Sequence, residues 1–202
     1  MIVDFSNIKA VILDFDCTIT REHTGGCAQG TDKLTVEYIK NNTKDLFVEF
    51  VMKAHACGVR LYIATYGDDS FAENDEDVAG HALVMRYMDN LFGPRQTFFK
   101  GPQRNPDGEI TRYHNVIARC SGDRKAFHLD IVLNDLGAHA LAHEILFVDD
   151  STSNLDYAYE QGCQLMVPRA PDTSASVSAD ERVFSLLMDR LSVMSGAVDA
   201  LE

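Results

Sequence analysis

Short, uninterrupted runs of apolar residues recur along the chain. The first run spans residues 10–14 and ends in an aspartate, and similar runs cover residues 60–64, 145–148 and 164–167. Apolar runs of this length are typical of strands that are buried on both faces of a parallel sheet. A further short run predicts a fifth strand at residues 96–99.

Longer segments with a helical spacing of apolar residues separate these runs. They cover residues 32–57, 78–91 and 125–136, and Gly58 and Gly137 follow the first and the last of them. Glycine is favoured just after a helix because it adopts left-handed backbone angles without steric cost. Alternating strands and helices predict an α/β fold with three layers, in which helices cover both faces of a doubly wound, mostly parallel sheet.

Three segments do not fit the alternation. Residues 20–31 are polar and glycine-rich, which predicts a loop beside the end of the first strand. Residues 101–123 contain the turn sequence Asn-Pro-Asp-Gly, which predicts a small hairpin insert. We therefore expect one domain over residues 1–169, a linker at 170–180 and an amphipathic helix within 181–202, which either packs on the domain or forms a homo-oligomer.

Composition and charge narrow the range of partners. The 202 residues carry a formal net charge of -13, and an acidic surface repels nucleic acids and anionic membranes. The chain contains no apolar run of about 18 residues, so no transmembrane helix is predicted. The chain begins without the basic segment of a signal peptide, and its five cysteines form no CxxC pair. We accordingly expect a cytoplasmic protein that binds neither nucleic acid nor membrane.

Acidic residues follow two of the predicted strands. Asp14 and Asp16 come at the end of the first strand, and Asp149 and Asp150 directly follow residues 145–148. One acidic residue in such a place is often a helix N-cap, but two pairs should meet at the carboxyl edge of the sheet. Two unit charges 4 Å apart repel by about 4 kcal/mol at an effective dielectric constant near 20. The cluster therefore requires a retained proton or a cation, and Mg²⁺ suits oxygen ligands of this kind.

The acidic pairs, together with a threonine and a lysine, resemble the four motifs of the haloacid dehalogenase (HAD) superfamily. Asp-x-Asp-x-Thr after a hydrophobic strand resembles the first motif, a strand ending in threonine the second, a lysine at a helix start the third, and Asp-Asp after a strand the fourth. The matching residues are Asp14, Asp16 and Thr18, then Thr65, then Lys125, and finally Asp149 and Asp150. The resemblance extends over about residues 8–168.

The spacing of these motifs leaves no room for a large cap domain. Lys125-x-x-His128, followed by Asp149-Asp150-x-x-x-Asn154, resembles the cap-less branch that includes the eukaryotic magnesium-dependent phosphatases. That resemblance implies a phosphatase whose substrate is a phosphorylated small molecule or a phosphoprotein.

The resemblance also implies a role for each motif. Asp14 would attack phosphorus and form an aspartyl-phosphate, while Asp16 would act as general acid and then as general base. The side chains of Thr65, Lys125 and Thr18 would bind the phosphoryl oxygens.

A magnesium site follows from the same motifs. Mg²⁺ would be held by Asp14, the backbone carbonyl of Asp16 and a carboxylate of Asp150 or Asp149. Asp150 aligns better with the metal-binding aspartate of the family, which leaves Asp149 to pair with Lys125.

Several alternatives stay open. Lys100 is the rival of Lys125 for the third motif, although Lys125 begins the helix that leads into the strand at 145–148. His23 in the glycine-bearing loop is a candidate substrate contact, whereas Cys17 is expected to pack away from the aspartates. The alternative functions are a HAD-type phosphotransferase or mutase and a non-catalytic HAD-like regulatory protein.

Overall fold

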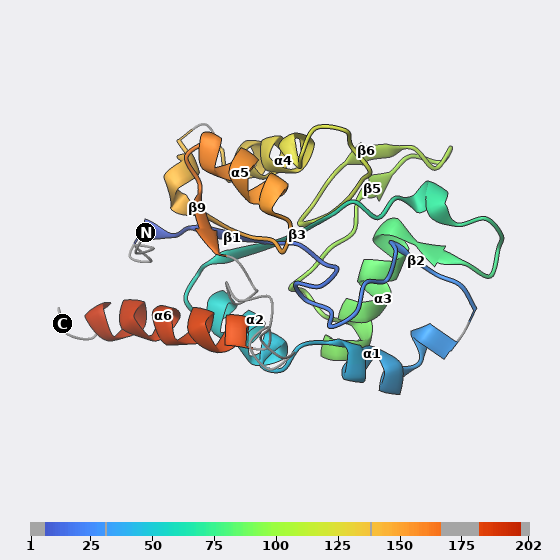
Figure 1. Cartoon of the computed structure of the whole chain (residues 1–202), viewed down its shortest axis with the longest axis horizontal. Coiled ribbons are helices and arrows are strands. Elements are labelled where there is room, and N and C mark those ends of the chain that lie inside the picture. The colour runs from blue at the N-terminus through green and yellow to red at the C-terminus, as the bar shows by residue number, and fades with distance from the viewer. Residues whose placement is uncertain (1–6, 31, 138, 167–181, 199–202) are drawn as a thin grey trace.

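A five-stranded parallel sheet forms the centre of the molecule (Figure 1). The computed structural model describes residues 7–30, 32–137, 139–166 and 182–198. The strand order is β7-β3-β1-β8-β9, with the following bounds: β1 Ala10–Leu13, β3 Arg60–Thr65, β7 Val116–Ala118, β8 Ile145–Val148 and β9 Gln164–Met166. The central strand β1 pairs with β3 on one side and with β8 on the other.

Helices cover both faces of this sheet. Along β1, Val11 and Leu13 belong to one apolar cluster, and Ala10 and Ile12 to the other, because successive side chains of a strand point to opposite faces. The first cluster packs under α1 Val36–Asn42, α2 Phe47–Ala56, α3 Gly80–Phe92 and α6 Val183–Val198, and the second under α4 Ala126–Leu136 and α5 Thr152–Glu160. The structure confirms the predicted three-layer α/β fold, and the described residues contain no large cap domain.

The prediction of a single helix over residues 32–57 is wrong. The segment is divided between α1 and α2, and the break occurs because the backbone of Thr43 and Lys44 pairs with the loop that follows β1. Thr43 forms an antiparallel bridge with Thr20, and the amide of Lys44 donates to the Ile19 carbonyl at 2.9 Å. The buried Lys44 ammonium also donates to the Cys17 carbonyl at 2.5 Å. This interruption holds the loop after β1 in place.

The strand predicted at 96–99 is also wrong. The Gln96 side chain closes a turn on the backbone of Phe99, which turns the chain away from the sheet, and the Phe99 ring stacks on Phe47 at 6.4 Å. The edge strand beside β3 is β7, which lies inside the segment 101–123. The predicted hairpin in that segment is confirmed, since β5 Gln103–Arg104 pairs with β6 Ile110–Arg112.

The last described helix packs on its own domain. In α6, Phe184 is fully buried and its ring lies 5.2 Å from Phe47 and 5.4 Å from Phe50. The linker predicted at 170–180 lies outside the described residues. Within the described part of the chain, none of the helices is long and apolar enough to cross a membrane.

Candidate active site

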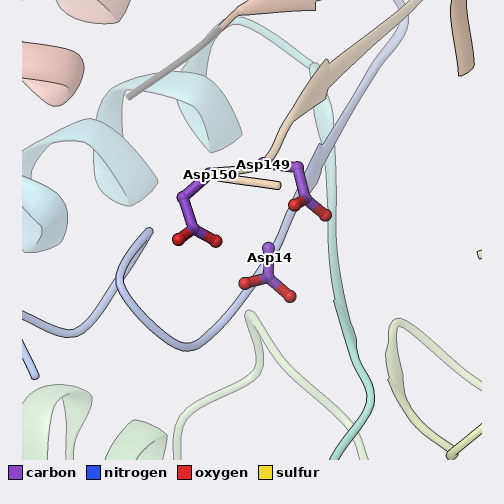
Figure 2. A group of neighbouring side chains, drawn as sticks. All are labelled: Asp14, Asp149 and Asp150. Carbon is purple, nitrogen blue, oxygen red and sulfur yellow. The ribbon is translucent and has the colours of Figure 1, made fainter. Parts of the chain in front are cut away.

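Three carboxylates gather at the carboxyl edge of the sheet. Asp14 directly follows β1, and Asp149 and Asp150 follow the neighbouring strand β8, whose Val148 carbonyl accepts the Asp14 amide at 2.9 Å. Each carboxylate offers one oxygen within 4.8 Å of the others, and Figure 2 shows them side by side. The convergence expected from the strand ends is therefore present in the fold.

The turn after β1 brings Asp16 back toward this edge. Cys17 adopts left-handed backbone angles (φ 58°), which reverse the chain directly after Asp16. One oxygen of the Asp16 carboxylate accepts the Thr24 amide at 2.9 Å and the Thr24 hydroxyl at 2.6 Å. The other lies 3.3 Å from Nδ1 of His23. The predicted loop at 20–31 thus holds the carboxyl group of Asp16 in one orientation.

A fully buried lysine lies between the acidic groups. The Lys125 ammonium donates to Asp14 Oδ1 at 2.5 Å and to the Ala64 carbonyl, and it lies 3.4 Å from Asp149 Oδ2. Burial alone disfavours a charged ammonium, but the Asp14 and Asp149 carboxylates outweigh it and raise the pKa of Lys125 above its ordinary value. Lys125 therefore stays charged and can attract an anion.

The pKa of Asp14 moves in the direction expected for a crowded acidic site. Burial raises it to about 7, and the charges of Asp149 and Asp150 add to the effect of burial, while Lys125 opposes both. Because burial and the neighbouring carboxylates both disfavour the ionised form of Asp14, a cation bound among these carboxylates would favour that ionised, nucleophilic form.

Asp149 and Asp150 differ in how deeply they are buried. The Asp149 carboxylate is fully buried, accepts the Asn154 amide on both oxygens at 3.1 Å and accepts the Ser151 backbone amide at 2.8 Å. Asp150 is only half-buried and lines the pocket described below. Asp149 therefore orients Lys125 and Asn154, and Asp150 is the better placed of the two to face an ion in the pocket.

Thr65, the last residue of β3, completes the edge. Its hydroxyl accepts the Gly67 amide at 3.3 Å, and its carbonyl accepts Nε2–H of His128 at 3.0 Å. The next residue, Tyr66, donates its hydroxyl hydrogen to Asn154 at 3.0 Å. These contacts connect the ends of β3 and β8 on the two sides of Asp14.

His128 makes the stability of the fold depend on pH. Burial lowers its pKa to about 3, and the nearby Lys125 charge acts in the same direction. In the folded protein His128 stays neutral down to about pH 3, whereas in the unfolded chain it takes up a proton near pH 6.5. Folding is therefore fully favoured with respect to this group above pH 6.5. As the pH falls from 6.5 toward 3, the free energy of unfolding decreases by up to about 1.4 kcal/mol per pH unit. We expect His128→Gln to lose less stability than the wild type between pH 7 and pH 5 in urea unfolding. The exposed His143→Gln is the control, and equal losses in wild type and His128→Gln would contradict this assignment.

These residues surround a pocket of about 330 Å³. Asp14, Asp16, Thr65, Asp149 and Asp150 line it at the strand ends, and His23 lines it from the loop. The other wall is formed by two loops whose backbones touch. A Cβ atom on Gly26 would lie 2.7 Å from the Gly67 Cα, and its φ of +72° also favours glycine.

Two of the predicted site residues lie elsewhere. Thr18 and Lys125 are both fully buried and outside the pocket lining, but the Lys125 ammonium pairs with Asp14 and Asp149, whereas the Thr18 hydroxyl has no hydrogen-bond partner among the described residues. The predicted contact of Thr18 with phosphate is therefore not retained. Lys100 is exposed and lines another cavity with Arg60, at the opposite end of β3. The geometry therefore favours Lys125 over Lys100 for the third motif.

Sequence patterns did not point to several other pocket residues. Tyr66 and Ser151 directly follow predicted site residues, and that adjacency could have identified them. Phe71 and Cys120 line the pocket from segments without a readable pattern, so nothing in the sequence marks them.

Comparison with known proteins supports the fold. No protein-family model matches the chain, and no curated protein is significantly similar to it. A similar solved structure is the 3-deoxy-D-manno-octulosonate 8-phosphate phosphatase of Moraxella catarrhalis, in complex with magnesium ion, phosphate ion and KDO. Its TM-score is 0.51 at 14% identity, and the match covers 98% of this chain and 95% of that one.

Two further structures are more distant. A probable YrbI-family phosphatase from Pseudomonas syringae matches with a TM-score of 0.48 and 15% identity over 98% of this chain and 94% of that one. DsGPDH of Dunaliella salina matches with a TM-score of 0.45 and 13% identity over 77% of this chain, which spans 22% of that protein. The similarity to the Moraxella phosphatase supports the predicted α/β fold with a mostly parallel sheet.

Proposed function

We propose that this protein is a Mg²⁺-dependent phosphomonoester hydrolase that works through an aspartyl-phosphate on Asp14. The observation that carries the proposal is the gathering of the Asp14, Asp149 and Asp150 carboxylates, with the buried Lys125 ammonium paired to Asp14 and Asp149. The shared fold adds support, because the Moraxella structure of that fold is a phosphatase in complex with magnesium and phosphate ions.

The residues present fit a hard divalent cation. Three carboxylates within 4.8 Å of one another repel strongly in a partly buried pocket, and oxygen ligands of this type match Mg²⁺. Asp14, Asp150 and the backbone carbonyl of Asp16 would hold the ion, with Asp149 acting through Lys125 and Asn154. When bound, Mg²⁺ would neutralise negative charge on the carboxylates and on the phosphoryl oxygens.

Asp14 and Asp16 divide the covalent chemistry between them. A carboxylate oxygen of Asp14 attacks phosphorus, the bond from phosphorus to the leaving oxygen breaks, and Asp16 gives its proton to that oxygen. Asp16 then takes a proton from a water molecule, which attacks phosphorus, releases phosphate and restores the Asp14 carboxylate. The contacts of Asp16 with Thr24 and His23 keep its carboxyl group oriented for both transfers.

Thr65 and Lys125 bind the transferred group. The Thr65 hydroxyl lines the pocket, and the Lys125 ammonium lies beside Asp14, where negative charge spreads over the phosphoryl oxygens in the transition state. Because Asp14, Asp149 and Ala64 already position the ammonium, little reorganisation is needed when phosphate arrives.

The substrate is a phosphorylated small molecule or a phosphorylated side chain of a protein. A pocket of about 330 Å³ is at the small end of the range for ligand sites. All five cysteines are free thiols, which supports a reducing compartment such as the cytoplasm.

Removal of the metal tests the proposal directly. The purified protein with Mg²⁺ should release phosphate from 4-nitrophenyl phosphate, and EDTA should abolish the release because the acidic cluster then loses its counter-ion. Added Mg²⁺ should restore the rate, which phosphate and nitrophenol assays can follow together. Phosphate release that is unchanged in EDTA would rule out the metal-dependent mechanism.

A further inference from the structure

A second cavity lies at the opposite end of the sheet from the candidate active site. Its volume is about 510 Å³, and Arg60 at the beginning of β3 lines it, whereas Thr65 at the end of the same strand lines the active-site pocket. At about 3.3 Å per residue, β3 separates the two places by roughly 16 Å. The second cavity is therefore a separate site.

Basic side chains outnumber acidic ones in the lining of this cavity. His55, Arg60, Lys100 and His114 line it, against one acidic residue, Asp135. The chain as a whole has 31 acidic residues and 18 lysines and arginines, so such a concentration of basic groups departs from the rest of the molecule. A concave surface with basic walls attracts anions.

The single acidic residue is already engaged. Asp135 accepts the Tyr62 hydroxyl at 2.7 Å, and its oxygens lie 3.6 Å from Arg60 and 4.0 Å from Arg112. Arg60 also donates to the Asp135 carbonyl at 3.1 Å. Asp135 therefore orients Arg60, and its charge is shared between two guanidinium groups.

Two of the basic groups remain available to a ligand. In the described part of the chain, the Lys100 ammonium and the His114 ring form no hydrogen bond or ion pair, although both line the cavity. A cation and an imidazole donor without partners, beside an oriented guanidinium, form a suitable set of donors for a phosphate group.

The cavity also has an aromatic wall and a braced shape. Phe98 lines it, and the His55 ring meets Phe98 edge to face at 5.2 Å. The Asn115 amide donates to the Leu61 and Phe98 carbonyls and accepts the Lys100 amide, which ties the Phe98–Lys100 segment to β3. A preformed site with an apolar face and a few convergent polar groups is typical of small-molecule binding.

We propose that this cavity binds a small organic phosphate that carries a planar ring. The phosphate group lies against Arg60, Lys100 and His114, and the ring lies against Phe98. The site is independent of the proposed hydrolase chemistry, because it shares no lining residue with the active-site pocket.

Adenosine monophosphate is the probe for this site, with adenosine as its matched control. Calorimetric titration in EDTA, where the candidate metal site is empty, should show one binding site for the nucleotide and none for the nucleoside. Asp14→Asn should bind the nucleotide as the wild type does, which separates this result from the fate of the proposed function. Absence of nucleotide binding, or equal binding of adenosine, overturns the proposal.

Variants then locate the site. Lys100→Ala combined with His114→Ala removes two donors that form no hydrogen bond or ion pair in the described part of the chain, so the fold and the melting temperature should be unchanged. The affinity for the nucleotide should fall tenfold or more, since a hydrogen bond to a charged group is worth about one power of ten. Lys40→Ala in α1 makes a similar charge change away from the cavity and should bind normally. Unchanged affinity in the double variant, or in Lys100→Ala alone, places the nucleotide elsewhere and overturns the proposal.

Discussion

Asparagine in place of Asp14 should abolish Mg²⁺-dependent phosphate release, with a fall of at least about 10⁴-fold in kcat. The amide has nearly the same shape as the carboxyl group and can still accept the Lys125 hydrogen bond, so the pocket should keep its geometry. It cannot attack phosphorus, however, and it is a poorer ligand for a divalent cation. Steady-state phosphate release with 4-nitrophenyl phosphate measures the loss.

A matched substitution distinguishes lost chemistry from lost folding. Asp130→Asn changes an exposed aspartate on α4 and should turn over at the wild-type rate. Asp14→Asn should unfold at a temperature close to that of the wild type, because Lys125 keeps Asp149 as its counter-charge and burial already disfavours a charge at position 14. Turnover near the wild-type rate in a folded Asp14→Asn protein would show that another residue is the nucleophile.

Methionine in place of Lys125 should remove both activity and much of the stability. The two side chains have similar length, and both face the same cost from the left-handed backbone angle at this position (φ 71°), so the substitution isolates the charge. Without the ammonium, Asp14 and Asp149 are left close together without their counter-charge. Removing one partner of a buried ion pair costs about 3–5 kcal/mol. Urea unfolding at pH 7 in EDTA measures that loss.

The metal provides a second readout for the same variant. Added Mg²⁺ should restore more stability to Lys125→Met than it adds to the wild type, because the cation becomes the main counter-charge of the acidic cluster. Lys100→Met is the control, since Lys100 is exposed, and its activity and stability should stay near those of the wild type. A Lys125→Met protein with wild-type stability in EDTA would contradict the central place given to this ion pair.

The main elements of the fold could be predicted because their signals are local. The apolar runs at 10–14, 60–64 and 145–148 correspond to β1, β3 and β8, and the helical patterns at 78–91 and 125–136 to α3 and α4. Each pattern reflects burial on both faces of a strand or on one face of a helix, which neighbouring residues record together.

The core of the candidate site was predictable for a related reason. Parallel strands end at one edge, so residues that follow β1, β3 and β8 must meet wherever those strands are neighbours. To predict that Asp14, Thr65 and Asp149 lie together, it was therefore enough to know the strand positions and that the sheet is parallel. The choice of Lys125 over Lys100 required the tertiary structure, because the turn before α4 buries Lys125 beside Asp14, whereas Lys100 is exposed elsewhere.

What could be derived from the amino-acid order alone was thus the layered α/β architecture and the acidic residues at the strand ends. Folding in three dimensions settled the break between α1 and α2, the replacement of residues 96–99 by β7 as the edge strand, the burial of Thr18 and the walls of both cavities. The physical reason is the range of the interactions. Backbone pairing of Thr43 with Thr20, stacking of Phe99 on Phe47 and the sharing of Asp135 among distant groups join parts of the chain that no local pattern connects.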